Sequence, residues 1–176
     1  TLTGTIAQVQ AAYTANTAGT ISGLGNEAVT LSDTSATATA LNTLNGVTSG
    51  TIDSTTITSV SGLATDLNTL YTAGGISNLG DENISITNTG TIASSTITTL
   101  DGYTTGTVSL TGSGSLAMTT TVGQTADLSG VTNSLTGTLT ISDNTGDEAI
   151  AGTTGNDIIN LTSGNETVNA NGGTDT

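Results

Sequence analysis

Glycine and acidic residues recur in a nine-residue register over residues 143–176 of the chain. Four glycines follow this spacing: Gly146, Gly155, Gly164 and Gly173. Two positions after each glycine stands an acid: Glu148, Asp157, Glu166 and Asp175. Two positions after the first three acids stands a β-branched apolar residue: Ile150, Ile159 and Val168. Carboxylates at one spacing supply hard oxygen ligands for a cation, and Ca²⁺ is the cation that suits such ligands best.

The rest of the composition excludes most other chemistry. The 176 residues include fourteen Asp and Glu but no Lys, Arg, His or Cys, which gives a formal net charge of −14. Imidazole and thiol catalysis, Schiff-base chemistry and arginine clamps are therefore impossible. Two carboxylates would suffice for a glycosidase, but without Trp, Phe or Arg the chain has little with which to form a sugar subsite. We predict that the chain is not an enzyme.

Nucleic acids and anionic membranes are also poor partners for this chain. Proteins bind both mainly through Lys and Arg, which neutralise phosphate groups. No stretch approaches the roughly 20 apolar residues that a membrane-spanning helix needs. We therefore expect no nucleic-acid partner and no membrane insertion.

One nine-residue turn carries a specific resemblance. Residues 152–160 read Gly-Thr-Thr-Gly-Asn-Asp-Ile-Ile-Asn and resemble the repeats-in-toxin nonapeptide G-G-x-G-x-D-x-U-x. The resemblance covers residues 143–176 and implies a parallel β-roll that holds Ca²⁺ between its turns. The metal-site residues that it implies are Glu148, Asp157, Glu166, Asp175, Gly155, Asn156, Gly164 and Gly173. Successive turns of such a roll alternate sides, so Glu148 and Glu166 should share one edge, and Asp157 and Asp175 the other.

The segment also departs from that pattern. Two of its acids are Glu, and three turns replace the leading Gly-Gly with Asp143-Asn144, Leu161-Thr162 or Ala170-Asn171. Because the turn of Asp157 is closest to the consensus, Asp157 is expected to contribute most to binding. The alternative is a metal-free β-roll in which ladders of Asn and Thr replace the ions.

A longer repeat precedes the nonapeptides. Residues 4–13 align with residues 62–71 at an offset of 58, and Leu24–Val29 (LGNEAV) matches Leu79–Ile84 (LGDENI). Residues 44–52 match residues 100–108 at an offset of 56. We predict three segments: two copies of a repeat of about 56–58 residues over 1–106, a β-rich connector over 107–142, and the nonapeptide β-roll over 143–176. Glu27 and Glu82 are either a paired metal site or solvated acids of two turns.

Short elements must position these residues. Alternating runs predict half-buried strands at Val29–Leu31, Ile84–Ile86 and Val108–Leu110. Leu63, Leu67, Leu70 and Tyr71 share one face of a predicted helix, with Ser61 as its cap and Gly74-Gly75 as its stop. The Ala-rich residues 36–44 predict a helix that ends at Gly46. Residues 92–100 are rich in Thr, Ser and Ile, which predicts a distorted helix or an extended corner. In the connector, residues 107–111, 117–122 and 137–142 are strand-like.

These elements favour a mainly β fold with a thin core. Tyrosine occurs three times and is the only aromatic residue type, so a thick globular core is not expected. We predict a repetitive β-solenoid, with a strand plus a short helix or loop per coil, that ends in a parallel β-roll.

The upstream repeats suggest where such a chain works. Residues 23–34 and 78–89 look like the units of giant secreted repeat proteins of cyanobacteria. That resemblance implies an extracellular or cell-surface structural role, as a filament, sheath or surface-layer subunit that associates with itself. A glycan-binding adhesin module is the alternative. An ice-binding solenoid is a remote one, suggested by the Thr-x-Thr pairs at 56/58, 96/98 and 138/140.

Overall fold

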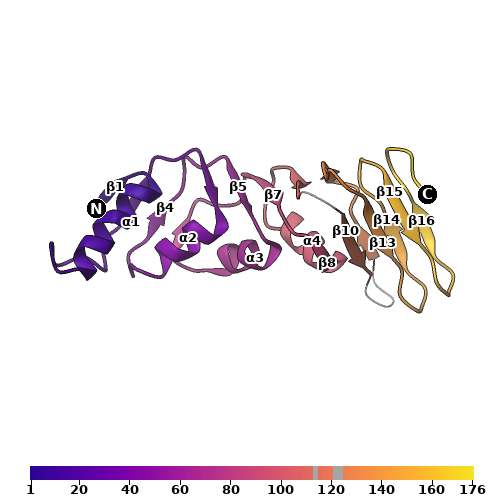
Figure 1. Cartoon of the computed structure of the whole chain (residues 1–176), viewed down its shortest axis with the longest axis horizontal. Helices are drawn as coiled ribbons and strands as arrows, with labels where there is room; N and C mark the ends of the chain where they lie inside the picture. Colours follow the sequence, from indigo (N-terminus) through magenta and orange to yellow (C-terminus); the bar gives the residue numbers. More distant parts are fainter. Residues whose placement is uncertain (113–114, 121–124) are drawn as a thin grey trace. The chain divides into compact units, whose positions relative to one another are not determined.

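The computed structural model describes residues 1–112, 115–120 and 125–176. This part of the chain contains sixteen short strands and four helices. It divides into two compact units, Thr1–Glu82 and Asn83–Thr176, which are indigo to magenta and pink to yellow in Figure 1. The strand pairs within each unit are parallel. The mainly β class predicted from the sequence is confirmed at this level.

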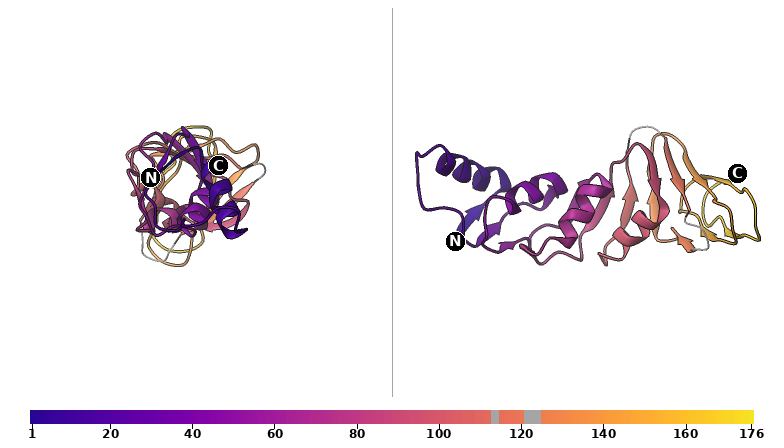
Figure 2. Two further views of the ribbon diagram at one scale, coloured as in Figure 1. Left: turned by 90° about the vertical axis from the view of Figure 1, so that its left-hand side faces the viewer. Right: turned by 90° about the horizontal axis from the view of Figure 1, so that it is seen from below.

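The first unit alternates strands with three helices. Strands β1 (Leu2–Gly4), β2 (Val29–Leu31), β4 (Ile52–Asp53) and β6 (Ile76–Ser77) form one sheet in that order. Strand β3 (Ser35–Thr37) pairs with β5 (Ser59–Gly62). Helices α1 (Ile6–Thr17), α2 (Ala38–Asn45) and α3 (Ala64–Thr72) follow one another along one side of the unit (Figure 2).

The second unit contains one helix and ten strands among its described residues. Strand β8 (Gly90–Ala93) leads into α4 (Ser94–Asp101). One sheet orders β15 (Asp157–Asn160), β13 (Leu139–Ser142), β10 (Leu116–Thr119) and β8. A second orders β11 (Thr125–Asp127), β14 (Ala149–Ala151) and β16 (Thr167–Asn169). A third group orders β7 (Asn83–Ile86), β9 (Val108–Leu110) and β12 (Val131–Asn133).

Neighbouring strands are separated by regular intervals along the chain. In the second unit, β7 pairs with β9. The N–H of Thr107, directly before β9, donates to the side chain of Asn83 at the start of β7, which is 24 residues earlier. The pairs β1–β2, β2–β4 and β4–β6 of the first unit keep intervals close to this one. The last two pairs, β13–β15 and β14–β16, have a shorter interval. There the Asn165 N–H donates to Asp147, 18 residues before it, an interval that equals two nonapeptides.

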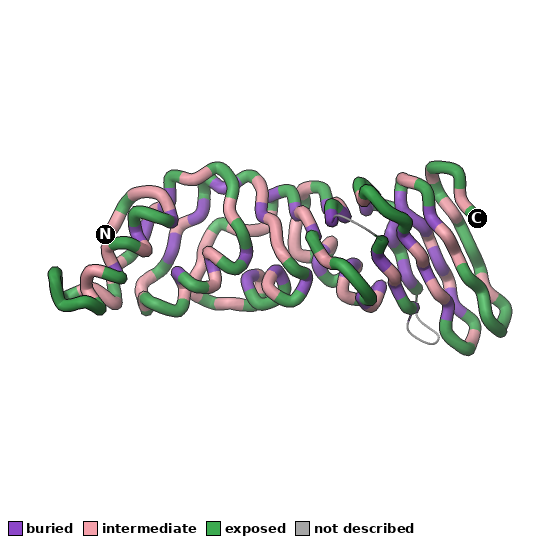
Figure 3. The backbone as a smooth tube through the Cα atoms, viewed as in Figure 1, coloured by how far each residue is buried: buried purple, intermediate pink, exposed green. Residues whose placement is uncertain are grey.

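A thin core runs along the strands and the inner faces of the helices. Both apolar ends of the three predicted alternating strands β2, β7 and β9 are buried, at 2% exposure or less. Leu67 and Leu70 of α3 are fully buried, as are Leu41 and Leu44 of α2. Burial decreases in the last strands (Figure 3), where Ile150 is 2% exposed but Val168 is 39% exposed.

The predicted helices form, with two corrections. Helix α2 ends at Gly46 as predicted, but α3 begins after Leu63, which replaces Ser61 as the N-cap and is 46% exposed. Residues 94–101 form a regular helix despite their poor propensity, because Ile97 and Leu100 are fully buried and tertiary burial outweighs propensity.

The predicted strands of the connector also form. Residues 108–110, 116–119 and 139–142 are strands, whereas residues 121–122 of the predicted run 117–122 lie outside the described residues. The three-segment division of the chain stays a prediction. Among the described residues, none of the helices has the length and apolar character needed to cross a bilayer.

Candidate metal centre

The nine-residue register places alternate turns side by side. Leu139 pairs with Asp157, Ala149 pairs with Thr167, and Thr145 forms a bridge with Ser163. The two partners in each case are separated by two nonapeptides. Turns that are one nonapeptide apart therefore lie on opposite edges, and turns that are two apart are neighbours. This arrangement confirms the predicted alternation of sides.

Two glycines of the register let neighbouring turns approach closely. A Cβ at Gly164 would overlap the carbonyl oxygen of Gly146, and one at Gly173 would overlap that of Gly155. Both glycines also have a positive φ, +140° and +106°, which other L-residues rarely adopt. Their role in the structure is steric and conformational.

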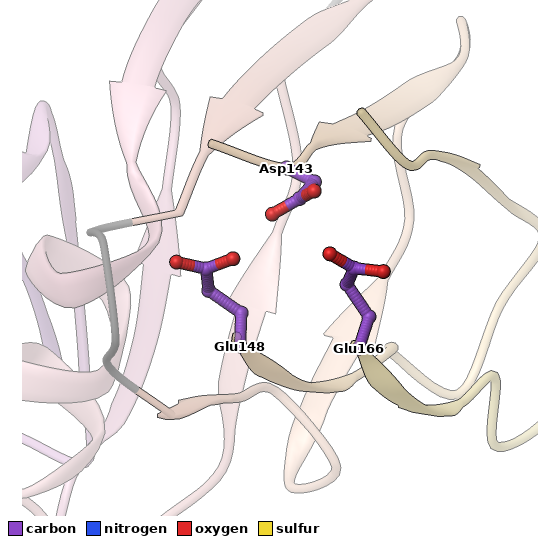
Figure 4. A group of neighbouring side chains, drawn as sticks. All are labelled: Asp143, Glu148 and Glu166. Atoms are coloured by element: carbon purple, nitrogen blue, oxygen red, sulfur yellow. The ribbon is translucent and has the colours of Figure 1, made fainter. Parts of the chain in front are cut away.

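On one edge, three carboxylates gather from three segments of the chain. Asp143 follows β13, Glu148 precedes β14, and Glu166 precedes β16. One carboxylate oxygen from each lies within 4.8 Å of the others, and the three side chains face one another (Figure 4). Asp143 and Glu148 are buried, at 7% and 2% exposure. The structure thus brings together two of the predicted site residues and adds Asp143.

The Asp143 carboxylate is held on one side only. Its Oδ2 accepts hydrogen bonds from the backbone N–H of Thr162 (3.1 Å) and from the Thr162 hydroxyl (3.2 Å). Its Oδ1 is buried and has no hydrogen-bond partner, and the same is true of Oε1 of Glu166. The Thr162 N–H lowers the pKa of Asp143, so this carboxyl group is ionised at neutral pH.

On the other edge, the Asp157 carboxylate is enclosed by protein donors. The backbone N–H of Thr153 donates to its Oδ2 at 2.7 Å, and the Thr153 hydroxyl donates to Oδ1 at 2.8 Å. The Asn133 amide lies 3.5 Å from Oδ1. Asp157 is only 2% exposed, and burial raises the pKa of this carboxyl group.

The remaining predicted site residues on this edge also hold the backbone. Asp175 Oδ1 accepts a hydrogen bond from the N–H of Asp157 (2.9 Å), and Asn156 Oδ1 accepts one from the N–H of Thr174 (2.8 Å). The Gly155 N–H donates to the Thr153 hydroxyl at 3.2 Å. The Asp175 and Asn156 contacts tie together two turns that are two nonapeptides apart.

The two edges therefore differ in their fit to a cation. The carboxylates of Asp143, Glu148 and Glu166 converge, which suits a hard divalent cation. Oδ1 of Asp143 and Oε1 of Glu166 have no hydrogen-bond donor. At Asp157, donors already occupy both oxygens. Asp143 was not among the predicted site residues, because it stands where the motif has glycine. The available signal was an acid in the first position of the turn that contains Glu148.

Glu27 and Glu82 have a different role in the first unit. The hydroxyl of Tyr13 donates to Glu27, and that of Tyr71 to Glu82, each at 3.2 Å. Each glutamate also accepts the N–H of the glycine two positions before it, Gly25 (2.8 Å) and Gly80 (2.6 Å). Glu82 is fully buried, so the description as a solvated turn acid is wrong for Glu82. Both glutamates tie a helix to the following turn.

A cleft of about 460 Å³ lies beside α1 and is lined in part by Gln10, Tyr13, Thr43 and Val47. Tyr13 is its one aromatic lining residue among those described, and this side chain is 4% exposed.

Comparisons of the chain with protein-family models, with curated proteins and with solved structures found no match.

Proposed function

We propose that this chain is a non-enzymatic structural segment of an extracellular surface protein. In this proposal its strands wind as a β-solenoid that ends in a parallel β-roll, and further coils or copies stack on its open strand edges to build a filament, sheath or surface layer. Calcium binding stabilises the β-roll. The single observation that carries the proposal is the regular parallel register, whose near-constant interval shortens to two nonapeptides in the last strand pairs.

The register supports the solenoid because it is what winding produces. Each coil of a solenoid contacts only its neighbours, and successive strands pair in parallel at a constant interval. The short strands and the thin line of buried Leu, Ile and Val agree with this architecture. None of these features requires a ligand or a catalytic group.

The last strand supports the stacking of coils. Among the described residues, β16 pairs on one side only, with β14. Val168 within it is 39% exposed, and Leu161 before it is 51% exposed. An open parallel edge with exposed apolar side chains invites pairing with another strand. The chain contains no Lys or Pro, which are the residues that commonly block such an edge.

Assembly can be tested by placing a lysine on this edge. Analytical ultracentrifugation and light scattering of the whole chain in millimolar Ca²⁺ should detect polymers, which Val168→Lys should reduce strongly. Thr99→Lys, at an exposed position of α4, introduces the same charge away from the edge and should assemble as the parent does. A parent chain that stays a compact monomer would overturn the assembly proposal.

The two alternative functions have less support. A glycan-binding adhesin usually offers aromatic faces, whereas Tyr13, the aromatic residue in the cleft beside α1, is buried and bonded to Glu27. An ice-binding surface needs threonine pairs in flat rows. Here Thr96 and Thr98 lie in helix α4, whereas Thr140 lies in strand β13.

A further inference from the structure

We infer that the calcium site of residues 143–176 is formed by Asp143, Glu148 and Glu166, and that Asp157 is instead a structural carboxylate. This inference rests on the calcium part of the proposed function and names the residues that would do the binding. It reverses the order of importance suggested by the nonapeptide consensus, in which the turn of Asp157 ranks first.

The three carboxylates lie close together. One oxygen from each carboxylate lies within 4.8 Å of the other two, although the side chains come from three separate segments. Figure 4 shows all three directed into the same space. Like charges this close are unfavourable unless a cation or a shared proton lies between them. The chain has no Lys, Arg or His that could supply the opposite charge.

The Asp143 side chain is buried, and one of its oxygens has no donor. It is 7% exposed, and its Oδ1 has no hydrogen-bond partner while Thr162 holds its Oδ2. A buried carboxylate oxygen without a donor is costly. The carboxylate faces Glu148 and Glu166, and a cation bound between the three groups would satisfy this oxygen.

Asp157 differs from this cluster in its hydrogen bonding. Its two oxygens receive the N–H and the hydroxyl of Thr153, at 2.7 and 2.8 Å. A cation there would have to share these oxygens with donors that already occupy part of their lone pairs. The carboxylate of Asp175 is likewise used, because its Oδ1 accepts the N–H of Asp157.

The ligand chemistry selects calcium among the hard cations. Three carboxylates offer up to six oxygens, and Ca²⁺ accepts six to eight oxygens in irregular arrangements. Mg²⁺ demands a strict octahedron and keeps several waters, which suits a crowded and buried cluster less well. We therefore expect Ca²⁺ to bind more tightly than Mg²⁺.

Calorimetric titration of the whole chain with Ca²⁺ tests the assignment. Asp143→Asn and Glu166→Gln each remove one ligand charge and should weaken binding by about tenfold or more, because charge count tunes calcium affinity. Asp157→Asn makes the same change of charge on the opposite edge and should leave the Ca²⁺ affinity within about threefold of that of the unmutated chain. Equal weakening by all three variants would overturn the assignment, because it would reflect net charge alone.

Hydrogen exchange of the unmutated chain gives a second readout that depends on no variant. Ca²⁺ should slow exchange at the Thr162 amide, which binds Asp143, more than at the Thr153 amide, which binds Asp157. The opposite order, or loss of binding only in Asp157→Asn, would place the ion on the other edge and overturn the inference while calcium binding itself stood. If no Ca²⁺ binds, both this inference and the calcium part of the proposed function fail. The ultracentrifugation experiment judges assembly separately.

Discussion

Tyr71 and Glu82 show how a chain without basic side chains accommodates a buried carboxylate. Glu82 is fully buried, and its oxygens accept the Tyr71 hydroxyl and the N–H groups of Gly80 and Asp81. These neutral donors replace the ion pair that a buried glutamate commonly has. The same arrangement recurs at Tyr13 and Glu27, so the repeat preserves this contact as well as its apolar positions.

We predict that Tyr71→Phe lowers the free energy of unfolding of the first unit by roughly 1–2 kcal/mol, because it removes a hydrogen bond to the buried Glu82 side chain. Denaturant unfolding at neutral pH measures this change. Tyr13→Phe is the matched control, and its effect should be smaller because Glu27 is only half-buried. Equal losses in the two variants would contradict the role of burial.

Tyr71 also predicts a dependence of stability on alkaline pH. Burial raises the pKa of the Tyr71 hydroxyl above its ordinary value of 10.0. A group whose pKa is raised by folding contributes stability that is fully present below its unfolded pKa and is lost at higher pH. The first unit should therefore lose stability as the pH rises above about 10. Tyr71→Phe should reduce that loss in a pH series of denaturant titrations.

At the scale of the elements, helix capping is unequal. Thr5 and Thr37 cap α1 and α2 by accepting the N–H of Gln8 and Ala40. The N-cap of α3 is Leu63, which makes no side-chain cap and is 46% exposed. Leu63→Thr should stabilise the first unit by about 0.5–2 kcal/mol, as measured by thermal unfolding. Thr37→Ala removes the side-chain cap of α2 and should destabilise the first unit by a similar amount.

Helix α4 depends on burial more than on its own propensity. Its sequence is rich in Ser and Thr, yet Ile97 and Leu100 are fully buried. Ile97→Ala should lower the stability of the second unit by about 2–5 kcal/mol and reduce the helical circular-dichroism signal. Thr99→Ala, at an exposed position of the same helix, should have little effect. A large loss for Thr99→Ala would show that the helix does not depend on its buried face.

Local patterns predicted most of these elements. Alternation located β2, β7 and β9, apolar spacing located α3, and an Ala-rich run located α2. The nine-residue spacing predicted that Glu148 and Glu166 would share an edge, because it reflects the backbone register. This spacing could not predict which carboxylate oxygens accept hydrogen bonds from the protein. The donors to Asp157 include Asn133 from another strand, and the third member of the cluster, Asp143, stands where the motif has glycine.

At the scale of the whole molecule, fourteen carboxylates have no side-chain cation to offset them. Self-repulsion therefore opposes the compact state, and dissolved salt screens it. We predict that the melting temperature rises as NaCl increases from about 0.01 M to about 0.5 M, a concentration range over which the Debye length falls severalfold. Thermal unfolding monitored by circular dichroism checks this, with an uncharged osmolyte as the control. A melting temperature that does not change with salt would contradict the role of charge.

The two-nonapeptide interval of the last strand pairs also limits how this segment can change in length during evolution. Loss of residues 146–163 removes one turn from each edge and leaves every later acid on its original side. Loss of residues 146–154 alone shifts each later turn to the opposite side. Asp157 would then lie on the edge of Asp143, and Glu166 would lie on the opposite edge. Insertions and deletions that preserve both edges must therefore come in pairs of nonapeptides, and functional length variants should differ by whole pairs.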